Sequence, residues 1–491
     1  MDQSIKDTNF KICKPQEHIT ETLTGYLTAH KHLSPISFHM PGHKGRSTLY
    51  GIYGFGGFVH NMMGADITEI PGADALQQPQ GVIKRVMNHY ASLYGVLHTE
   101  LLVNGSSVGL MAAILSTVPR GGYLITGRNS HKSVYSGMRL GGIEPIYVLP
   151  EIDCQTGLQG GINPKEIEKT LEKHPEADAV LITSPNYYGV LSDLQKIADI
   201  VHKYNKILIV DQAHGAHLKF FDYFGENYRA AENCDADIVV NSIHKTLLSF
   251  TGTAILNICS NRIDIEKVSE NLRMLQTTSP SYLMMGSLDI NEQILRQDGY
   301  ELIKRWEKDV EYFYKECKKI RGVSLIIRKD MDLTKINLSM SDCGLDGTNL
   351  YKELMQRNIW CELVHGDYVM LLTGIGNERG DYEEVLTALR EISQRYRYCD
   401  QKRSKQIKNN LTLGIPEKKK MPLYKTKVPL YCAEGCIAYD PIVAYPPGSP
   451  IICPGEVISR KFVIYIRTLL ENNVVVSGVD EEGCIAVSAD E

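Results

Sequence analysis

Short apolar segments alternate with amphipathic segments between residues 85 and 245, and this alternation restricts the possible folds more than any other feature. Two apolar segments read ADAVLITSP (177–185) and KILIVDQAH (206–214), and the amphipathic stretch LSDLQKIADIVHKYN (191–205) lies between them. Strands that are apolar throughout are typical of parallel sheets, which helices cover on both faces. The pattern therefore predicts an α/β fold with a mostly parallel sheet.

Polar or ionisable residues follow several of these predicted strands directly. They are Ser106, Ser107, His131, Asp211, His214, Ser242, His244 and Lys245. In open α/β sheets, ligands bind at the carboxyl ends of the strands. We therefore expect these side chains to share one pocket.

The 491 residues are enough for more than one domain, and the pattern changes along the chain. Residues 1–60 are rich in His and Gly and predict an irregular arm. Residues 61–290 predict the large domain, and residues 291–400 predict a compact α+β domain that begins with long helices. Residues 401–491 predict an exposed basic linker, up to about residue 422, and a small C-terminal subdomain.

Bulk composition excludes several classes of protein. A net charge of −5 gives no reason to expect nucleic acid or an anionic membrane surface as a partner. No apolar run approaches the roughly 18 residues of a membrane span, and the N-terminus lacks the apolar core of a signal peptide. The twelve cysteines are scattered, which favours free thiols in the cytoplasm. Cys432, Cys436 and Cys453 do not have a standard zinc spacing, so no metal site is predicted.

The residues at the strand ends match what pyridoxal 5′-phosphate (PLP) requires of a protein. Lys245 follows a strand beside His244, where burial and nearby positive charge would make its amine nucleophilic. Asp211 would pair with the pyridinium N–H of the cofactor. The plainer interpretations are a surface lysine and a helix-capping aspartate.

A phosphate site and a ring-stacking group complete the requirement. Gly105 allows a tight turn, Ser106 and Ser107 offer hydroxyls, and the helix that follows attracts an anion at its N-terminus. His131 would stack on the cofactor ring. A serine N-cap and a surface histidine are the alternatives. Each signal is weak alone, but their order and shared position favour one PLP site.

With these residues identified, the sequence resembles the bacterial PLP-dependent ornithine/lysine/arginine decarboxylases of fold type I, in their short arginine decarboxylase-like branch. The resemblance covers most of the chain. It implies an aspartate aminotransferase-like large domain and a homodimer, or a higher homo-oligomer, with active sites at the dimer interface. The matching segments are FHMPGHKG (38–45), ALQQPQGVIK (75–84), VNGSSVG (103–109), RNSHKSV (128–134), DQAHG (211–215), NSIHKTL (241–247) and YPPGSPIICPGEVI (445–458).

The resemblance implies a role for each matching residue. Lys245 would form the Schiff base with PLP, Asp211 would hold the pyridine nitrogen, and His131 would stack on the ring. The implied phosphate ligands are Ser106, Ser107, Ser242 and His244. His214 would lie beside the cofactor near its reactive side, and Lys245 or His244 would protonate the substrate Cα.

The substrate contacts are expected at acidic residues and in the arm. Asp440 and Asp74 would receive the distal cation of a basic amino acid, with Asp66 a further acidic candidate. A surface turn before Pro441 is the alternative interpretation of Asp440. His39 is a third substrate-binding candidate, and His43 and Lys44 would help to shape the site. Gln77 or Gln78 replaces a histidine of the family pattern, which changes the neighbouring contacts.

The expected reaction is decarboxylation of a basic L-amino acid, first of all arginine to agmatine and CO₂ in polyamine biosynthesis. Lysine and ornithine are alternative substrates. An aminotransferase or a C–S lyase on the same fold is a further alternative, with Arg379 as the candidate carboxylate clamp. A relative without catalytic activity is disfavoured, because Lys245, Asp211 and His131 are all present.

Overall fold

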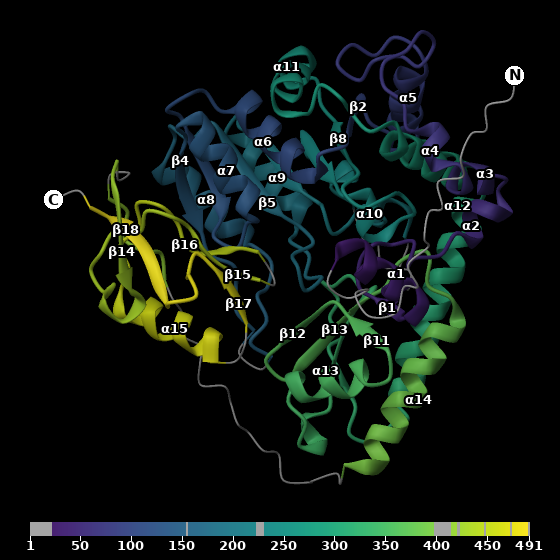
Figure 1. Ribbon diagram of the computed structural model, residues 1–491. Coiled ribbons are helices and arrows are strands. Elements are labelled where there is room, and N and C mark those ends of the chain that lie inside the picture. The colour runs from purple at the N-terminus through teal and green to yellow at the C-terminus, as the bar shows by residue number, and fades with distance from the viewer. Residues whose placement is uncertain are drawn as a thin grey trace, which may run out of the picture.

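A computed structural model describes most of the chain and places a large domain, a small domain and a C-terminal subdomain around one another (Figure 1). The described residues are 22–153, 156–221, 230–396, 414–419, 423–445, 448–471 and 474–489.

A seven-stranded sheet with the order β2-β8-β7-β6-β5-β3-β4 forms the centre of the large domain. The strands are β2 (His98–Leu102), β3 (Tyr123–Gly127), β4 (Glu144–Val148), β5 (Ala179–Thr183), β6 (Ile207–Asp211), β7 (Ile238–Asn241) and β8 (Ala254–Ile258). Strands β4, β3, β5, β6 and β7 run parallel, and β8 pairs antiparallel with both β7 and β2. The prediction of a mostly parallel sheet is therefore confirmed.

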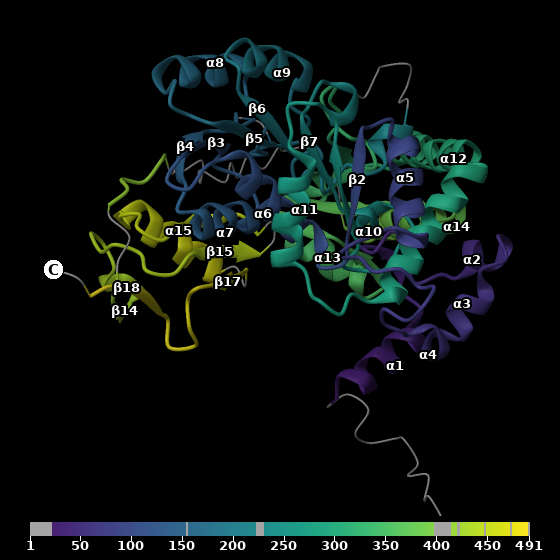
Figure 2. The same ribbon diagram turned by 90° about the horizontal axis from the view of Figure 1, so that it is seen from above.

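Helices cover both faces of this sheet, as Figure 2 shows. They include α6 (Gly105–Thr117), α7 (Lys132–Gly141), α8 (Pro164–Lys173), α9 (Leu194–Lys203) and α11 (Ile265–Leu275). Alternate side chains of β5 point to opposite faces: Leu181 packs with α6, α7 and α11, whereas Val180 and Ile182 pack with α8 and α9. Since both faces of the strand are buried, its residues are apolar throughout, which explains the alternation in the sequence.

The small domain is connected to the large one by α12 (Tyr282–Cys317), a 36-residue helix with a kink at Asp298. This helix runs across the boundary predicted at residue 290 and packs against both α5 (Val82–Tyr94) and α14 (Arg379–Arg395). A four-stranded antiparallel sheet of order β12-β13-β10-β9 completes the domain. Its other elements are β9 (Ser324–Leu325), β10 (Lys335–Ser339), α13 (Gly347–Met355), β11 (Ile359–Cys361), β12 (Leu363–His365) and β13 (Tyr368–Leu372).

The prediction of an irregular N-terminal arm is wrong for residues 22–60. These residues form α1 (Leu23–Leu33), β1 (Ile36–Phe38), α2 (Thr48–Ile52) and α3 (Gly56–His60), and α4 (Met62–Ala65) follows. The strand β1 pairs in parallel with β11 of the small domain. The helices α2, α3 and α4 are short and contain glycine, so they have too little apolar periodicity to be recognised in the sequence.

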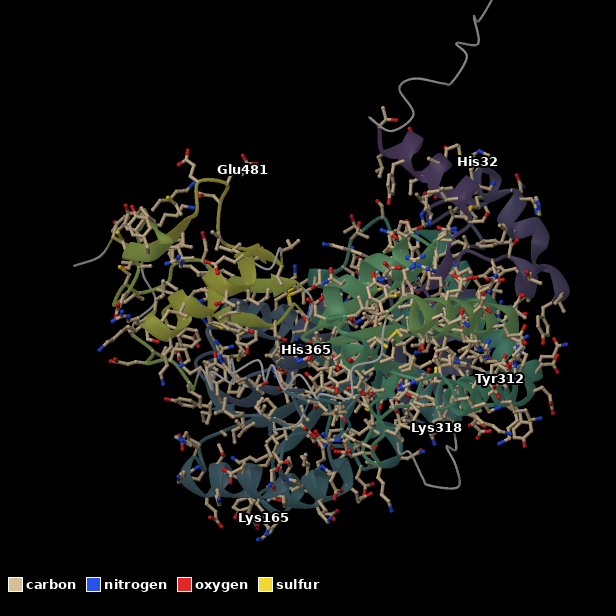
Figure 3. All side chains as sticks on the ribbon, turned by 90° about the horizontal axis from the view of Figure 1, so that it is seen from below. His32, Lys165, Tyr312, Lys318, His365 and Glu481 are labelled. Carbon is tan, nitrogen blue, oxygen red and sulfur yellow. The ribbon has the colours of Figure 1, made fainter. Side chains whose placement is uncertain are left out.

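The C-terminal subdomain has its own hydrophobic core, built from strands and α15 (Arg460–Glu471). The strands are β14 (Lys425–Pro429), β15 (Ile442–Tyr445), β16 (Pro450–Ile452), β17 (Val475–Ser477) and β18 (Cys484–Ser488). Figure 3 shows Glu481 at the outer end of this subdomain and His365 near the centre of the molecule. Most of the predicted linker, residues 401–413 and 420–422, lies outside the described residues.

The subdomain is attached to the large domain close to His131. The Arg128 side chain is 8% exposed; it donates to the carbonyl oxygens of Pro450 (2.6 Å) and Ile451 (3.0 Å) and pairs with the buried Glu456 (2.9 Å). The Lys132 N–H donates to Gly448 O at 3.2 Å. The loop that carries His131 is therefore held from two sides.

Candidate active site

Lys245 lies in the short helix α10 (Ile243–Thr246), immediately after β7. Its Nζ is 2.8 Å from Nε2 of His214, which follows the neighbouring strand β6. Burial lowers the pKa of Lys245 to about 8, although the negative charges of Asp211 and Glu362 oppose this shift. Near neutral pH, Lys245 therefore has a substantial fraction of neutral, nucleophilic amine.

Asp211 is the last residue of β6 and is 2% exposed. Its Oδ1 accepts a hydrogen bond from the Ala213 N–H at 3.1 Å. Burial raises the pKa of Asp211, and the charge of Lys245 offsets only part of that effect. A buried carboxylate of this kind gains most from a cationic N–H donor, which a protonated pyridine nitrogen provides.

The first turn of α6 forms a candidate anion site. Gly105 begins the helix with φ = +78°, in the left-handed region that favours glycine. Ser106 and Ser107 follow in that turn, and the Ser242 hydroxyl donates to Ser106 Oγ at 2.8 Å. Two of the predicted phosphate ligands, from different strand ends, are thus in direct contact beside a helix N-terminus.

The imidazoles of His131 and His244 are held in defined tautomers. Nδ1 of His131 accepts from the Ser133 N–H, so Nε2 carries the proton. Nδ1 of His244 donates to Thr253 O at 2.8 Å, so Nε2 is the acceptor. Burial lowers the pKa of each to about 4. Both rings are therefore neutral at physiological pH, and a phosphate at Nε2 of His244 would favour its protonation.

His214 has one buried nitrogen without a partner among the described residues. Its Nε2 faces Lys245, whereas Nδ1 is buried and makes no hydrogen bond. Burial and the charge of Lys245 hold the pKa of His214 well below its usual range. An orphaned buried donor costs free energy unless a ligand supplies an acceptor. Together with Asp211 and the α6 anion site, it fits a cofactor with oxygen and pyridine groups, such as PLP.

The motif PGHK (41–44) of the arm packs directly beneath the Lys245 segment. The Gly42 N–H donates to His244 O at 2.7 Å, and Gly42 O accepts from the Gly376 N–H at 3.0 Å. Lys44 is buried, and its Nζ donates to the carbonyl oxygens of His39 (2.8 Å) and Leu372 (2.9 Å). The arm, the Lys245 helix and the small domain therefore meet backbone to backbone.

Gly42→Ala is expected to destabilise the protein by about 3 kcal/mol, because a Cβ at this position would overlap the backbone of Thr246 and Leu247. Gly45→Ala is the matched control: Gly45 has φ = +72° but open space around it, so we expect a cost of about 1 kcal/mol. Urea unfolding of both variants measures the difference. Equal losses would contradict the close approach at Gly42.

Glu362 belongs to the site but was not predicted from the sequence. It lies between β11 and β12, and its carboxylate accepts from the His39 ring (2.6 Å), the Met40 N–H (3.1 Å) and the Tyr187 hydroxyl (3.0 Å). Burial opposes its ionisation, but the His39 contact and the other hydrogen bonds lower its pKa. The Tyr187 ring also contacts the His214 ring, at 4.8 Å between centroids. The available signal was one acidic residue inside an apolar run, IWCELV (359–364).

The structure places the predicted substrate residues differently from one another. His39 contacts Glu362 and so lies beside the site. The Asp74 carboxylate caps α5, and it accepts from the five backbone N–H groups of Ala75, Gln80, Gly81, Ile83 and Lys84. Asp440 lies in the bend before β15 and is partly exposed. The substrate roles of these residues remain predictions.

Arg379, the candidate clamp of an aminotransferase, is bound elsewhere. Its Nε donates to Asp309 at 2.7 Å, and its guanidinium lies 4.0 Å from the centre of the Tyr312 ring. These contacts hold the first residue of α14 against α12. The structure therefore gives Arg379 a structural role and removes the main support for an aminotransferase.

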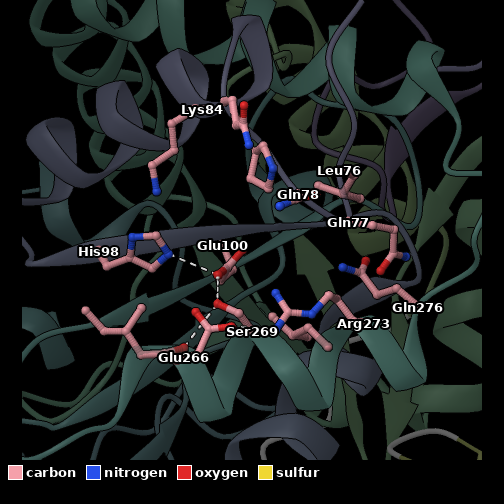
Figure 4. A pocket seen from close by; sticks show the side chains of 14 residues that line it. Leu76, Gln77, Gln78, Lys84, His98, Glu100, Glu266, Ser269, Arg273 and Gln276 are labelled. Atoms are coloured by element: carbon pink, nitrogen blue, oxygen red, sulfur yellow. Dashed lines mark hydrogen bonds and ion pairs between the residues drawn. The ribbon is translucent and has the colours of Figure 1, made fainter. Parts of the chain in front are cut away.

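A pocket of about 300 Å³ lies outside the Lys245 site, between residues 76–84, β2 and α11 (Figure 4). Its polar side chains pair with one another: Glu100 accepts from the Ser269 hydroxyl at 2.6 Å and contacts the His98 ring at 3.0 Å. Gln77 and Gln78, one of which replaces a histidine of the family pattern, also line it. Since Lys245, Asp211 and His131 do not line this pocket, we do not assign the chemistry to it.

Comparisons with known proteins identify the family of this chain. The family model described as the major domain of Orn/Lys/Arg decarboxylases matches residues 21–329. An arginine decarboxylase of Bacillus anthracis is 32% identical over 475 residues, which are 93% of this chain and 94% of that protein. An arginine decarboxylase of Bacillus subtilis (strain 168) is 31% identical over 480 residues, 95% and 96% of the two chains.

Solved structures confirm the fold. The constitutive lysine decarboxylase of Escherichia coli superposes with a TM-score of 0.74 at 18% identity, over 98% of this chain and 80% of that one. A serine palmitoyltransferase of Sphingomonas wittichii, at 15% identity over 73% and 86% of the chains, gives a TM-score of 0.55. The fold type I prediction is thus confirmed. The Bacillus relatives confirm the short arginine decarboxylase-like branch. The chain belongs to the Orn/Lys/Arg decarboxylase family.

Proposed function

We propose that this protein decarboxylates L-arginine to agmatine and CO₂ with PLP as its cofactor. The observation that supports arginine as the substrate is the similarity to Bacillus arginine decarboxylases, at 30 to 32% identity over 89 to 95% of this chain. A lysine decarboxylase of Pseudomonas aeruginosa is only 21% identical. Arginine is therefore favoured over lysine and ornithine.

The residues of the site would divide the work between holding the cofactor and handling protons. PLP, when bound, withdraws electrons from the substrate Cα as CO₂ leaves. Lys245 would bind the aldehyde, Asp211 would keep the pyridine nitrogen protonated, and the serines of α6 and Ser242 would bind the phosphate. The neutral His131 ring suits a position against the cofactor face. Lys245 or His244 would return a proton to Cα.

His214 would orient Lys245 during this cycle. Its Nε2 is 2.8 Å from the Lys245 amine and accepts a hydrogen bond from it. Since the pKa of His214 lies well below its usual range, this nitrogen stays unprotonated and keeps its lone pair for Lys245. The amine is thereby directed by a neutral acceptor, whereas a carboxylate in the same position would favour its ammonium form.

Glu362 is the acidic group that we propose to face the distal cation of the substrate, in addition to Asp440. Its carboxylate is buried, acts electrostatically on Lys245 and accepts three hydrogen bonds. A carboxylate offers about four acceptor sites, so one remains for a guanidinium N–H. Asp74 is a weaker candidate, because backbone N–H groups occupy its carboxylate.

Incubating the purified protein and PLP with L-arginine, L-lysine or L-ornithine tests this function directly. We expect CO₂ and agmatine, with kcat/KM for arginine at least about tenfold above the other substrates. Mass spectrometry of the amines and trapping of CO₂ provide the measurement. Formation of a keto acid, or the absence of CO₂ from all three substrates, would refute the proposal.

The same assay on two carboxylate variants tests the substrate contact. Glu362→Gln should raise KM for arginine about tenfold with a smaller change in kcat, because the charge-assisted contact to the guanidinium is lost. Asp440→Asn, in the C-terminal subdomain, tests the other candidate carboxylate in the same way. A rise in KM for Asp440→Asn alone would assign the substrate cation to Asp440 instead.

We also propose that the protein forms a homodimer and acts in the cytoplasm. Helix α1 has no buried residue, and Leu23, Tyr26, Leu27 and Leu33 are exposed, which supports a second copy covering this arm. Among the described residues, none of the helices is both long and apolar enough to cross a membrane. A homodimer in the cytoplasm, with a role in polyamine biosynthesis, is consistent with the proposed reaction.

A further inference from the structure

A second lysine is buried next to the candidate site. Lys335 is the first residue of β10 in the small domain and is 0% exposed. Its Nζ donates to the carbonyl oxygen of His214 at 2.7 Å and to Asp332 Oδ2 at 2.5 Å. Burying an ammonium costs free energy unless its donors are satisfied, so a fully buried lysine is rare. This one lies close to Lys245.

Asp332, which forms an ion pair with Lys335, also contacts His217. Its Oδ2 lies 3.1 Å from His217 Nε2, and its Oδ1 accepts from the Thr334 hydroxyl at 2.7 Å. Burial alone would raise the pKa of Asp332, but Lys335 and His217 hold it far below its usual range. An ionised carboxylate only accepts hydrogen bonds, so His217 Nε2 carries a proton.

The tautomer of His217 then determines the next contact. Burial lowers the pKa of His217, so the ring is neutral and Nδ1 is an acceptor. The Thr246 hydroxyl lies 3.1 Å from Nδ1 and must be its donor. Thr246 directly follows Lys245, and its carbonyl oxygen accepts from the Ile375 N–H at 2.9 Å.

Both partners of the contact between His214 and Lys245 are therefore tied to one ion pair. Lys335 holds the backbone of His214, and Asp332 holds the Lys245 segment through His217 and Thr246. We propose that the Asp332–Lys335 pair is a positioning element of the small domain that sets the reactivity of the Lys245 amine. Among the described residues, the hydrogen bonds that connect the pair to the reacting lysine run through His214, His217 and Thr246.

The charges around Lys245 give the direction of the effect. Asp211 and Glu362 favour its ammonium form, whereas burial and the positive charge of Lys335 disfavour it. The imidazoles of His131, His214 and His244 are neutral near pH 7. Removing Lys335 should therefore raise the pKa of Lys245, and each unit lowers the neutral amine fraction at pH 7 about tenfold.

The test measures the reactivity of Lys245 in the full chain without cofactor, and the cofactor absorbance of the holoenzyme. A small amine-reactive probe is applied across pH 6–10, and mass spectrometry gives the modification rate of Lys245. The wild-type rate should rise through a midpoint near pH 8. Lys335→Met should move that midpoint upward and slow modification at pH 7 about tenfold. The pH at which the absorbance of lysine-bound PLP changes should shift in the same direction.

Two further variants separate charge from position. Thr246→Val removes the hydrogen bond to His217 without changing any charge, so it should slow modification while leaving the pH midpoint in place. Lys304→Met is the matched control, because Lys304 also pairs with a carboxylate three residues away, Glu307, at 3.0 Å, but its side chain is 45% exposed. It should match the wild-type profile.

The double variant Asp332→Asn/Lys335→Met covers the case in which Lys335→Met does not fold, since it leaves no buried charge unpaired. An unchanged pH profile in both the single and the double variant would overturn the proposal. The inference rests on Lys245 being the group that reacts with PLP, and not on the identity of the amino acid. Absence of PLP absorbance in the wild type would refute the proposed function, while the probe would still report on Lys335.

Discussion

Lys245→Ala is expected to reduce decarboxylation by at least about 10³-fold, on the order of 4 kcal/mol of transition-state stabilisation. The lowered pKa of Lys245, about 8, and its contact with His214 make it the amine best prepared to bind the PLP aldehyde. Alanine removes that amine and the proton it carries, but it does not disturb the strand β7 before it. The stability of the protein without cofactor should therefore change little.

Borohydride reduction followed by peptide mapping measures this directly. The wild type should retain PLP covalently on the peptide that contains Lys245, and the variant should retain none. Lys132→Ala is the control, because Lys132 is exposed and lies next to His131. Added methylamine should restore part of the activity of Lys245→Ala, increasingly so at higher pH, where the free amine is neutral. Full activity in the variant would exclude Lys245 as the cofactor lysine.

Asp211→Asn is expected to lower kcat about 10³-fold, because a neutral amide does not keep the pyridine nitrogen protonated. Without cofactor, the same substitution should increase the free energy of unfolding. Burial raises the pKa of Asp211 above its unfolded value, so its contribution to stability is full below about pH 4 and is lost as pH rises through the folded pKa. At pH 7 the ionised, buried carboxylate destabilises the folded protein, and asparagine removes that charge.

Thermal unfolding measures the stability of the cofactor-free variant and the stabilisation that PLP adds to each protein. At pH 7 the cofactor-free variant should melt above the cofactor-free wild type, and saturating PLP should stabilise the wild type more than the variant. Near pH 4 the two cofactor-free proteins should differ less, since Asp211 is then protonated. An equal gain from PLP in both proteins would contradict the pairing of Asp211 with the cofactor.

Residues at the ends of parallel strands were within reach of sequence analysis. Asp211 ends β6 and Lys245 follows β7, and these strands are neighbours in the sheet, so both residues lie at the same edge. The structure adds the contacts between Lys245 and His214 and between Ser242 and Ser106. What the site residues do for catalysis is still a prediction, to be decided by the variants above.

The site residues that the small domain contributes could not be predicted from the sequence. Glu362 and Lys335 lie in or beside short strands, and nothing in their local pattern indicates that they face a site made by a different domain. Their positions depend on how α12 docks one domain against the other, which is a tertiary effect. Asp74 shows the converse: its acidic side chain suggested a substrate contact, and the structure uses the carboxylate to cap a helix.

The packing of the arm against the small domain has a consequence for biosynthesis. Arg46 donates to Gly376 O across a sequence separation of 330 residues. At a synthesis rate of about 5–20 residues per second, the arm leaves the ribosome on the order of 20–60 s before this partner does. During that interval the Gly42 backbone and the buried Lys44 have no small domain to contact. The nascent chain must therefore complete the Lys245 site last, after most of the large domain has been synthesised.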